Sequence, residues 1–268
     1  MNLIQRIDDI AKESKAKVGI GVRYPHDWVV QFAEEAKDSA DILLIGDEGK
    51  IKETGTKLEI FGSTDPEREL VKLLVEGRID AAVRGNLKAS ETLNHLKDQV
   101  GLKKVCRIAL LQTASGNLFF LAPVGIDEGK NADEKVELII RGCKFLKRLD
   151  FETKVGVLSG GRHGDVGRSE MVDRSLKEAE VVVHRVTKMG IDAAHHQILI
   201  EDAIKESNII IAPDGISGNL IFRTLVFLGG GIGFGAPILM DKVFIDTSRA
   251  GDSYGRAIKL ASALAGRL

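Results

Sequence analysis

Short apolar runs rich in β-branched residues alternate with longer amphipathic segments along almost the whole chain of 268 residues. Residues 17–22 have the sequence KVGIGV and residues 42–46 the sequence ILLIG, so both runs are almost continuously apolar. Such a strand is buried on both faces of its sheet, and helices must supply the cover. The alternation therefore predicts an α/β fold.

The same patterns predict the positions of individual elements. Strands are expected at 17–22, 42–46, 81–83, 107–112, 118–122, 154–158, 209–212 and 243–245, with a further short strand at 181–183. Helices are expected at 27–39, 66–76, 90–100, 132–149, 170–180, 198–207, 220–228 and 256–264. The turn-rich sequence TASGN at residues 113–117 is typical of a hairpin between two neighbouring strands.

A polar stretch with turn residues, DEGKNA at 127–132, marks the expected boundary between two α/β lobes with a cleft between them. We expect residues 1–127 and 246–268 to form the first lobe and residues 128–245 the second. Ligands of such folds bind at the carboxyl ends of strands. The segments that directly follow strands are therefore the places to search for a site.

Composition narrows the class of partner. The chain has 38 Lys and Arg against 39 Asp and Glu, a net charge of −1, which argues against a nucleic-acid-binding protein. No apolar stretch reaches the roughly 18 residues of a membrane helix, and the charged amino terminus does not resemble a secretion signal. Two cysteines exclude a disulfide scaffold and fit a reducing cytoplasm. A small-molecule ligand is expected instead.

The sequence DGISGN at 214–219 lies between an expected buried strand and an expected helix. Small residues there allow a ligand to approach the backbone, and the free N–H groups of a helix start attract an anion. Asp214, Ser217, Gly218 and Asn219 are therefore candidate substrate-binding residues. The same residue types are equally typical of a helix cap.

The sequence DTSR at 246–249 follows an expected strand. Ser248 can donate a hydrogen bond to a phosphate oxygen, and Arg249 can bind the phosphate with two parallel hydrogen bonds. If the chain continues as a helix, Asp252 lies one turn after Ser248, where a carboxylate can act as a general base or orient the serine. The alternative is a capped helix with a surface arginine.

Two further loops carry cations and hydrogen-bonding groups at strand ends. The first supplies the candidates Arg84, Gly85, Asn86, Lys88 and Ser90, and the second supplies Ser159 and Arg162. Such groups suit a phosphate or an acidic substrate. Both loops are also compatible with simple solvated connections. The glycine run at 229–235 follows a helical segment, so it does not meet the context of a dinucleotide-binding fingerprint.

No metal site is expected. The adjacent residues His195 and His196 project in different directions from either a strand or a helix, which is poor geometry for joint metal binding. The chain contains no H-E-x-x-H or C-x-x-C motif.

Several of these pieces, in the same order, resemble the phosphate acetyl/butyryl transferase family over nearly the whole chain. The segments that carry this resemblance are KVGVLS at 154–159, GIDAA at 190–194, DGISGN at 214–219 and DTSRAGDS at 246–253, together with ILLIGD at 42–47. The short length and the form Arg84-Gly85-Asn86 resemble the methanogen branch of this superfamily, the methyltransferase-related MtxX proteins, also labelled methanogenesis marker protein 4.

The resemblance implies two α/β lobes around a cleft, like isocitrate and isopropylmalate dehydrogenases, in a homodimer. It implies transfer of a small acyl group between phosphate and coenzyme A, a co-substrate, with no tightly bound cofactor. Ser248 and Arg249 match the family's Ser-Arg pair, and Asp192 matches the aspartate of its x-D-A-A loop.

The family's phosphotransacetylases carry their carboxylate roughly where Gly255 stands, so Asp252 is the nearest candidate base. The alternative is an accessory, methyltransferase-related protein that keeps only an anion-binding cleft. A decarboxylating dehydrogenase is disfavoured because no cluster of aspartates has the spacing of a divalent-metal site.

Overall fold

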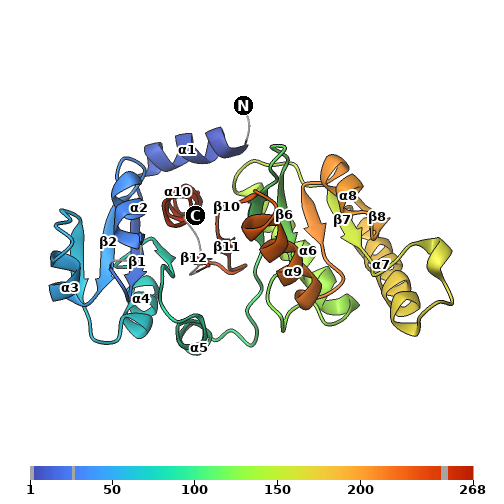
Figure 1. Ribbon diagram of the computed structural model, residues 1–268, viewed down its shortest axis with the longest axis horizontal. Coiled ribbons are helices and arrows are strands. Elements are labelled where there is room, and N and C mark those ends of the chain that lie inside the picture. Colours follow the sequence, from blue (N-terminus) through green and yellow to red (C-terminus); the bar gives the residue numbers. More distant parts are fainter. Residues whose placement is uncertain (1–2, 26–27, 249–252, 268) are drawn as a thin grey trace. The chain divides into compact units, whose positions relative to one another are not determined.

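The computed structural model describes residues 3–25, 28–248 and 253–267. The chain divides into two compact units, one made of residues 1–105 and 234–268 and the other of residues 106–233. Each unit contains a six-stranded sheet flanked by helices (Figure 1). The predicted α/β class is thus confirmed, although both sheets are mixed and not purely parallel. Among the described residues, no helix has the length and apolar character needed to cross a membrane.

The first sheet has the strand order β11-β12-β4-β1-β2-β3. Its parallel strands are β1 (Lys17–Val22), β2 (Asp41–Gly46), β3 (Glu59–Gly62), β4 (Ala81–Val83) and β12 (Val243–Asp246), and the antiparallel edge strand is β11 (Ala236–Pro237). The chain proceeds outward from β1 through β2 to β3 and then returns to add β4 on the other side of β1. This reversal is the position at which open α/β sheets bind ligands, outside the carboxyl ends of the strands.

Helices cover both faces of this sheet (Figure 1). They are α1 (Leu3–Ser14), α2 (Val29–Glu35), α3 (Glu48–Lys52), α4 (Pro66–Val75), α5 (Ala89–Val100) and α10 (Tyr254–Ala265). Successive strand residues face opposite layers. Phe244 packs in the cluster formed with α4 and α5, whereas Ile245 faces the side of α10, since a Cβ added to Gly235 would meet both Ile245 and Ala257 of α10. The continuous apolar runs exist because each strand is buried on two sides.

The second sheet has the strand order β10-β5-β6-β9-β7-β8. Its strands are β5 (Ala109–Gln112), β6 (Leu118–Ala122), β7 (Val155–Leu158), β8 (Ala193–Gln197), β9 (Ile209–Ile211) and β10 (Ile232–Gly233). The predicted hairpin is confirmed by the antiparallel pairing of β5 with β6. The chain passes from β7 outward to β8 and then returns to place β9 on the other side of β7, so this sheet has its own reversal between β7 and β9.

The second unit also contains the helices α6 (Ala132–Lys147), α7 (Glu170–Lys188), α8 (Ile200–Glu206) and α9 (Gly215–Phe227) and the short 3-10 helix η1 (His163–Asp165). The expected strand at 181–183 is wrong, because α7 continues through it. The valines of that segment have high strand propensity. However, Leu176, Ala179, Val182 and Val186 recur at helical spacing and bury one face of α7, and this tertiary packing outweighs local propensity.

The division of the chain differs from the predicted lobes of 1–127 with 246–268 and 128–245. The structure assigns residues 106–127 to the second unit, because the β5–β6 hairpin extends that sheet through the pairing of β6 with β9. It assigns residues 234–245 to the first unit, where β11 pairs with β12 and β12 with β4. The polar stretch at 127–132 is a connection inside the second unit.

Candidate functional site

Arg84 follows β4 at the carboxyl edge of the first sheet, but its side chain is enclosed. Its Nε donates to Asp246 Oδ1 at 2.5 Å and its Nη1 donates to the carbonyl oxygen of Leu87 at 2.5 Å. Only 4% of the Arg84 side chain and 10% of the Asp246 side chain are exposed. Arg84 therefore fixes the ends of β4 and β12 to each other, whereas the sequence predicted contact with substrate.

Asn86 and Gly85 hold the loop after β4 against β1 and the segment that follows it. Asn86 Oδ1 accepts from the backbone N–H of Arg23 at 2.6 Å, and Asn86 Nδ2 donates to the carbonyl oxygen of Tyr24 at 2.7 Å. Gly85 has a φ of 62°, and a Cβ at this position would lie 1.9 Å from the carbonyl oxygen of Gly21. Only glycine fits such a close approach in this conformation. Both residues thus shape the reversal between β1 and β4.

Ser248, the first predicted catalytic residue, is half-buried and follows β12 at the same edge. Its neighbour Thr247 donates from Oγ1 to the carbonyl oxygen of Gly85 at 2.8 Å, which brings this segment beside the loop after β4. The other two predicted catalytic residues, Arg249 and Asp252, lie outside the described residues.

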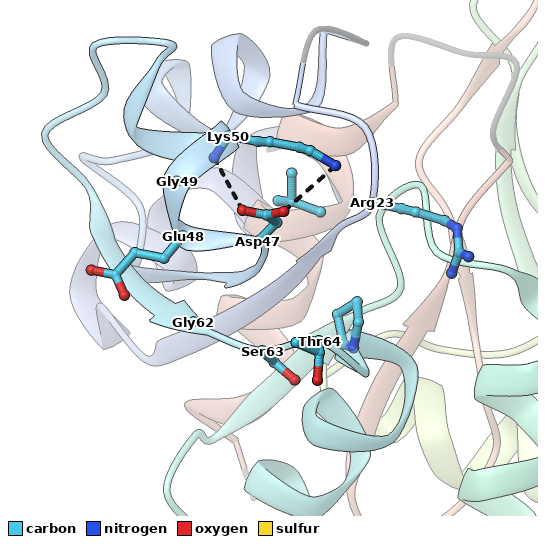
Figure 2. Close-up of a pocket in the computed structure, with 10 residues that line it drawn as sticks. Arg23, Asp47, Glu48, Gly49, Lys50, Gly62, Ser63 and Thr64 are labelled. Carbon is cyan, nitrogen blue, oxygen red and sulfur yellow. Dashed lines mark hydrogen bonds and ion pairs between the residues drawn. The ribbon is translucent and has the colours of Figure 1, made fainter.

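A pocket of about 800 Å³ opens at this carboxyl edge, over the ends of β1, β2 and β3 (Figure 2). Its lining is mostly polar: Val22, Arg23, Asp47, Glu48, Gly49, Lys50, Gly62, Ser63, Thr64 and Pro66. No sequence motif had indicated these residues as a site. The rule that ligands bind after strands could have indicated Asp47, which directly follows the predicted strand at 42–46. Ser63 and Thr64 follow β3, a strand that was not predicted.

The charges of the pocket are held in place by neighbouring groups. Asp47 Oδ1 accepts from the backbone N–H of Lys50 at 3.2 Å, and Lys50 Nζ lies 3.5 Å from Asp47 Oδ2, as Figure 2 shows. The backbone hydrogen bond lowers the pKa of Asp47, which keeps it ionised. The Arg23 guanidinium pairs with the buried carboxylate of Glu67, and 30% of the Arg23 side chain is exposed. The pocket thus presents fixed charges of both signs.

The segment at 214–219 forms the first turn of α9. Asp214 Oδ1 accepts from the backbone N–H of Ser217 at 2.8 Å, and Asn219 Nδ2 donates to the carbonyl oxygen of Val124 at 2.9 Å. A Cβ on Gly218 would lie 1.9 Å from a backbone carbonyl oxygen in the segment after β6. These contacts match the alternative interpretation of the segment, a helix cap packed against its neighbour.

Ser159 follows β7 and is turned inward, with 1% of its surface exposed. Its Oγ donates to the carbonyl oxygen of Gly161 at 3.0 Å and lies 2.9 Å from Nε2 of His195 in β8. Burial, and secondarily the neighbouring His163, lower the pKa of His195 below its ordinary value of 6.5. At neutral pH the His195 ring is therefore uncharged.

Of the remaining predicted residues, Lys88 lies beside the pocket, because its backbone N–H donates to Oε1 of Glu67 at 3.2 Å. Lys88 Nζ pairs with Glu91 at 2.6 Å, and Ser90 is exposed in the first turn of α5. Arg162 is exposed before η1. Asp192 is exposed and precedes β8, so it lies at the amino end of that strand, away from the carboxyl edge at which the other candidates were placed.

The structure also brings together three side chains that the sequence analysis did not combine, those of His163, Glu180 and His195. They come from η1, α7 and β8, so no sequence motif connects them.

Comparison with known proteins gives close relatives among the methanogens. The chain is 53% identical to a Methanosarcina acetivorans protein over 98% of its own length and 95% of that protein, and 51% identical to a Methanosarcina mazei protein with the same coverage. Both are provisionally named as subunit X of a methyltransferase, mtx. The phosphate butyryltransferase of Clostridium acetobutylicum is 25% identical over 96% of this chain and 95% of that protein. No protein-family model matches the chain.

Among solved structures, a phosphotransacetylase from Streptococcus pyogenes superimposes with a TM-score of 0.73 at 18% identity, over 98% of this chain and 97% of that one. A 4-hydroxythreonine-4-phosphate dehydrogenase from Klebsiella pneumoniae superimposes with a TM-score of 0.63 at 11% identity, over 94% of this chain and 100% of that one. These similarities establish a shared fold.

Proposed function

The chain belongs to the MtxX family of methanogen proteins, and we propose that it is a phosphate acyltransferase-like enzyme that moves a small acyl group between phosphate and coenzyme A. Similarity to phosphate butyryltransferase over nearly the whole length of both chains supports this proposal. The fold shared with phosphotransacetylases supports it as well, because these proteins are named for acyl transfer to or from phosphate.

The pocket at the carboxyl edge of the first sheet is the observation that carries the proposal. Coenzyme A contains a ribose and several phosphates. Asp47 follows the second strand of the sheet, the place from which an acidic residue in dinucleotide-binding folds accepts hydrogen bonds from ribose hydroxyls. Lys50, Ser63 and Thr64 are donors suited to phosphate oxygens. A volume of about 800 Å³ lies within the usual range for small-molecule sites.

In the proposed reaction the thiolate of coenzyme A attacks the carbonyl carbon of an acyl phosphate. The carbon–sulfur bond forms, the carbon–oxygen bond to phosphate breaks, and inorganic phosphate leaves with the electron pair. Ser248, which follows β12, and Arg249, the next residue in the sequence, are proposed to bind the phosphate and to stabilise its growing charge. Asp252 is the candidate group that accepts the thiol proton.

One observation favours the second candidate function, an accessory protein that binds an anion without acyl transfer. Gly255 lies in the first turn of α10, where the family resemblance places the carboxylate of the phosphotransacetylases. A Cβ on Gly255 would lie 3.0 Å from the carbonyl oxygen of Phe32, so a side chain there would require α2 and α10 to move apart by a few tenths of an ångström. If Asp252 does not replace the missing carboxylate, the pocket binds its ligand without turnover.

The test is thioester formation by the full-length protein. Coenzyme A is incubated with acetyl, propionyl or butyryl phosphate, and the acyl-CoA product is measured by mass spectrometry. We expect turnover with at least one of the three, reduced by about 100-fold or more in Arg249→Ala, since loss of one group that stabilises transition-state charge has such an effect. Arg78→Ala is the matched control: Arg78 stacks 5.3 Å from the Phe61 ring, and it precedes β4 at the opposite edge of the same sheet.

Binding of phosphate or coenzyme A without any turnover would favour the accessory function. Absence of both binding and turnover would exclude both candidates. The homodimer implied by the family resemblance remains a prediction, and light scattering of the purified protein, with an expected mass of two chains, tests it.

A further inference from the structure

The second unit places two imidazoles and one carboxylate around a common point. One potential ligand atom from each of His163, Glu180 and His195 lies within 4.8 Å of the other two. Nδ1 of His163 is 3.8 Å from Oε1 of Glu180, and the two imidazole rings are nearly perpendicular, with their centroids 5.4 Å apart. We propose that these three side chains, called the His–Glu trio below, bind a divalent transition-metal ion such as Zn²⁺.

The distances fit an ion after a small adjustment. Zinc lies about 2.0–2.1 Å from nitrogen and oxygen ligands, so two ligand atoms of a tetrahedral site are roughly 3.3 Å apart. The separation between His163 and Glu180 is only a little wider, and the separations of these two residues from His195 are within 4.8 Å. Both side chains are more than half exposed, at 58% and 57%, so side-chain rotation alone can close the difference. The Glu180 carboxylate also supplies a negative charge that offsets part of the ion's charge.

The third ligand, His195, makes a hydrogen bond with Ser159. Ser159 Oγ donates to the carbonyl oxygen of Gly161, so it accepts from the Nε2–H of His195. This arrangement assigns the proton to Nε2 and leaves the lone pair of Nδ1 for a cation. Histidines that bind metals nearly always donate from their other nitrogen to an acceptor, most often a carboxylate, a backbone carbonyl or water, and here the Ser159 hydroxyl occupies that place.

The backbone around the trio is fixed by Gln197, the last residue of β8. Its side-chain Oε1 accepts from the backbone N–H of His163 at 2.9 Å, and its carbonyl oxygen accepts from the N–H of Ser159 at 2.8 Å. Gln197 has a φ of 57°, and the register between β7 and β8 shifts directly after His195. Such bulges redirect side chains, and strained residues persist where neighbouring contacts hold them. Gln197 therefore connects the segments that carry His163, His195 and Ser159.

The donor set indicates the kind of ion. Two imidazoles and one carboxylate suit Zn²⁺ and neighbouring transition metals, whereas Mg²⁺ and Ca²⁺ prefer oxygen ligands only. Three protein ligands leave a fourth position for water or for an anionic oxygen of a ligand, which is typical of catalytic zinc sites and not of structural ones. The trio lies near the carboxyl ends of β7 and β8, the edge at which such sheets bind ligands.

The test uses full-length protein without an affinity tag, freed of metal by a chelator. Titration with Zn²⁺ is followed by calorimetry, and titration with Co²⁺ by visible absorption, which intensifies when the ion is tetrahedral. We expect one ion per chain, undisturbed by a large excess of Mg²⁺. His163→Ala and Glu180→Gln should each weaken binding by at least tenfold. Because both residues are exposed, both variants are expected to fold, and circular dichroism checks this.

His184→Ala is the matched control, since His184 is exposed on the same helix one turn after Glu180 and lies outside the trio. Affinity should be unchanged in this variant. The proposal is overturned if no stoichiometric binding occurs, or if His163→Ala retains the wild-type affinity. It is also overturned if His184→Ala loses the ion while His163→Ala keeps it, because the ion would then be bound by the surface pair Glu180 and His184.

Discussion

Arg84 and Asp246 form a buried ion pair between two strand ends, and removal of one partner leaves the other charge buried without compensation. We expect Arg84→Ala to lower the free energy of unfolding by about 3–5 kcal/mol. Urea denaturation measures this loss. Lys52→Ala, which removes the exposed pair of Lys52 with Glu48, should change stability by no more than about 0.5 kcal/mol. A similar loss of unfolding free energy in both variants would contradict the burial of the pair formed by Arg84 and Asp246.

Gly85 and Gly77 share the left-handed backbone conformation but differ in their surroundings. At Gly77, with a φ of 70°, an added Cβ would have nothing within 4 Å, whereas at Gly85 the backbone oxygen of Gly21 occupies that position. We expect Gly77→Ala to cost about 1–2 kcal/mol, the cost of that conformation alone. Gly85→Ala should cost clearly more. Denaturation curves of the two variants measure these costs. An equal loss of unfolding free energy in both would contradict the close approach of Gly85 to the backbone of β1.

The two cysteine thiols are expected to be unreactive in the native protein. Burial raises the pKa of Cys106 from 9.0 to about 11 and also raises the pKa of Cys143. Two pKa units correspond to about a hundredfold smaller thiolate fraction at pH 8, and the thiolate is the reactive form. Ellman's reagent should therefore label native Cys106 about a hundredfold more slowly than the unfolded chain. Rapid labelling of both thiols before unfolding would contradict the half-buried position of Cys106 and the buried position of Cys143.

At the scale of elements, the sequence patterns located most strands and helices because burial on two faces leaves a strong apolar signal. The hairpin between β5 and β6 and the helix at α4, with Asp65 accepting from Arg68 N–H at its start, follow from local residues alone. The strand β8 was missed because AAHHQ, at residues 193–197, is half exposed and lacks that signal.

Asp214, at the start of α9, is either a helix cap or a ligand contact, and substitutions distinguish the two roles. Asp214→Ala should destabilise the protein by about 1 kcal/mol through loss of the hydrogen bond to the backbone of Ser217, while Asp214→Ser, which retains a capping oxygen, should lose much less. Thermal melting measures both effects. If Asp214→Ser instead abolishes coenzyme A binding at unchanged stability, Asp214 is a ligand contact, as the sequence analysis first suggested.

Side chains that meet only through the fold could not be found from the sequence. The pocket over β1, β2 and β3 combines residues from three strand ends, and the His–Glu trio combines a short 3-10 helix, an α-helix and a strand. Conversely, Arg84 and Asn86 looked like ligand contacts, because a strand-end arginine and asparagine have the same residue types whether they bind a substrate or the neighbouring backbone.

At the scale of the whole molecule, each unit has a carboxyl edge at which its strand order reverses, and the two edges differ in chemistry. The first carries the polar pocket with Arg23 and Lys50, and the second carries the His–Glu trio. The proposed acyl transfer depends on the first edge, whereas metal binding depends on the second. A variant of the trio should therefore leave coenzyme A binding intact, and calorimetry with coenzyme A on His163→Ala measures this.

Hydrogen exchange of the full-length protein, with and without saturating coenzyme A, tests the assignment of the ligand site most directly. The proposed site predicts slower exchange of backbone amides in residues 22–24, 47–50 and 62–66, the segments that line the pocket. Protection confined to residues 106–233, or no change in any segment, would contradict it.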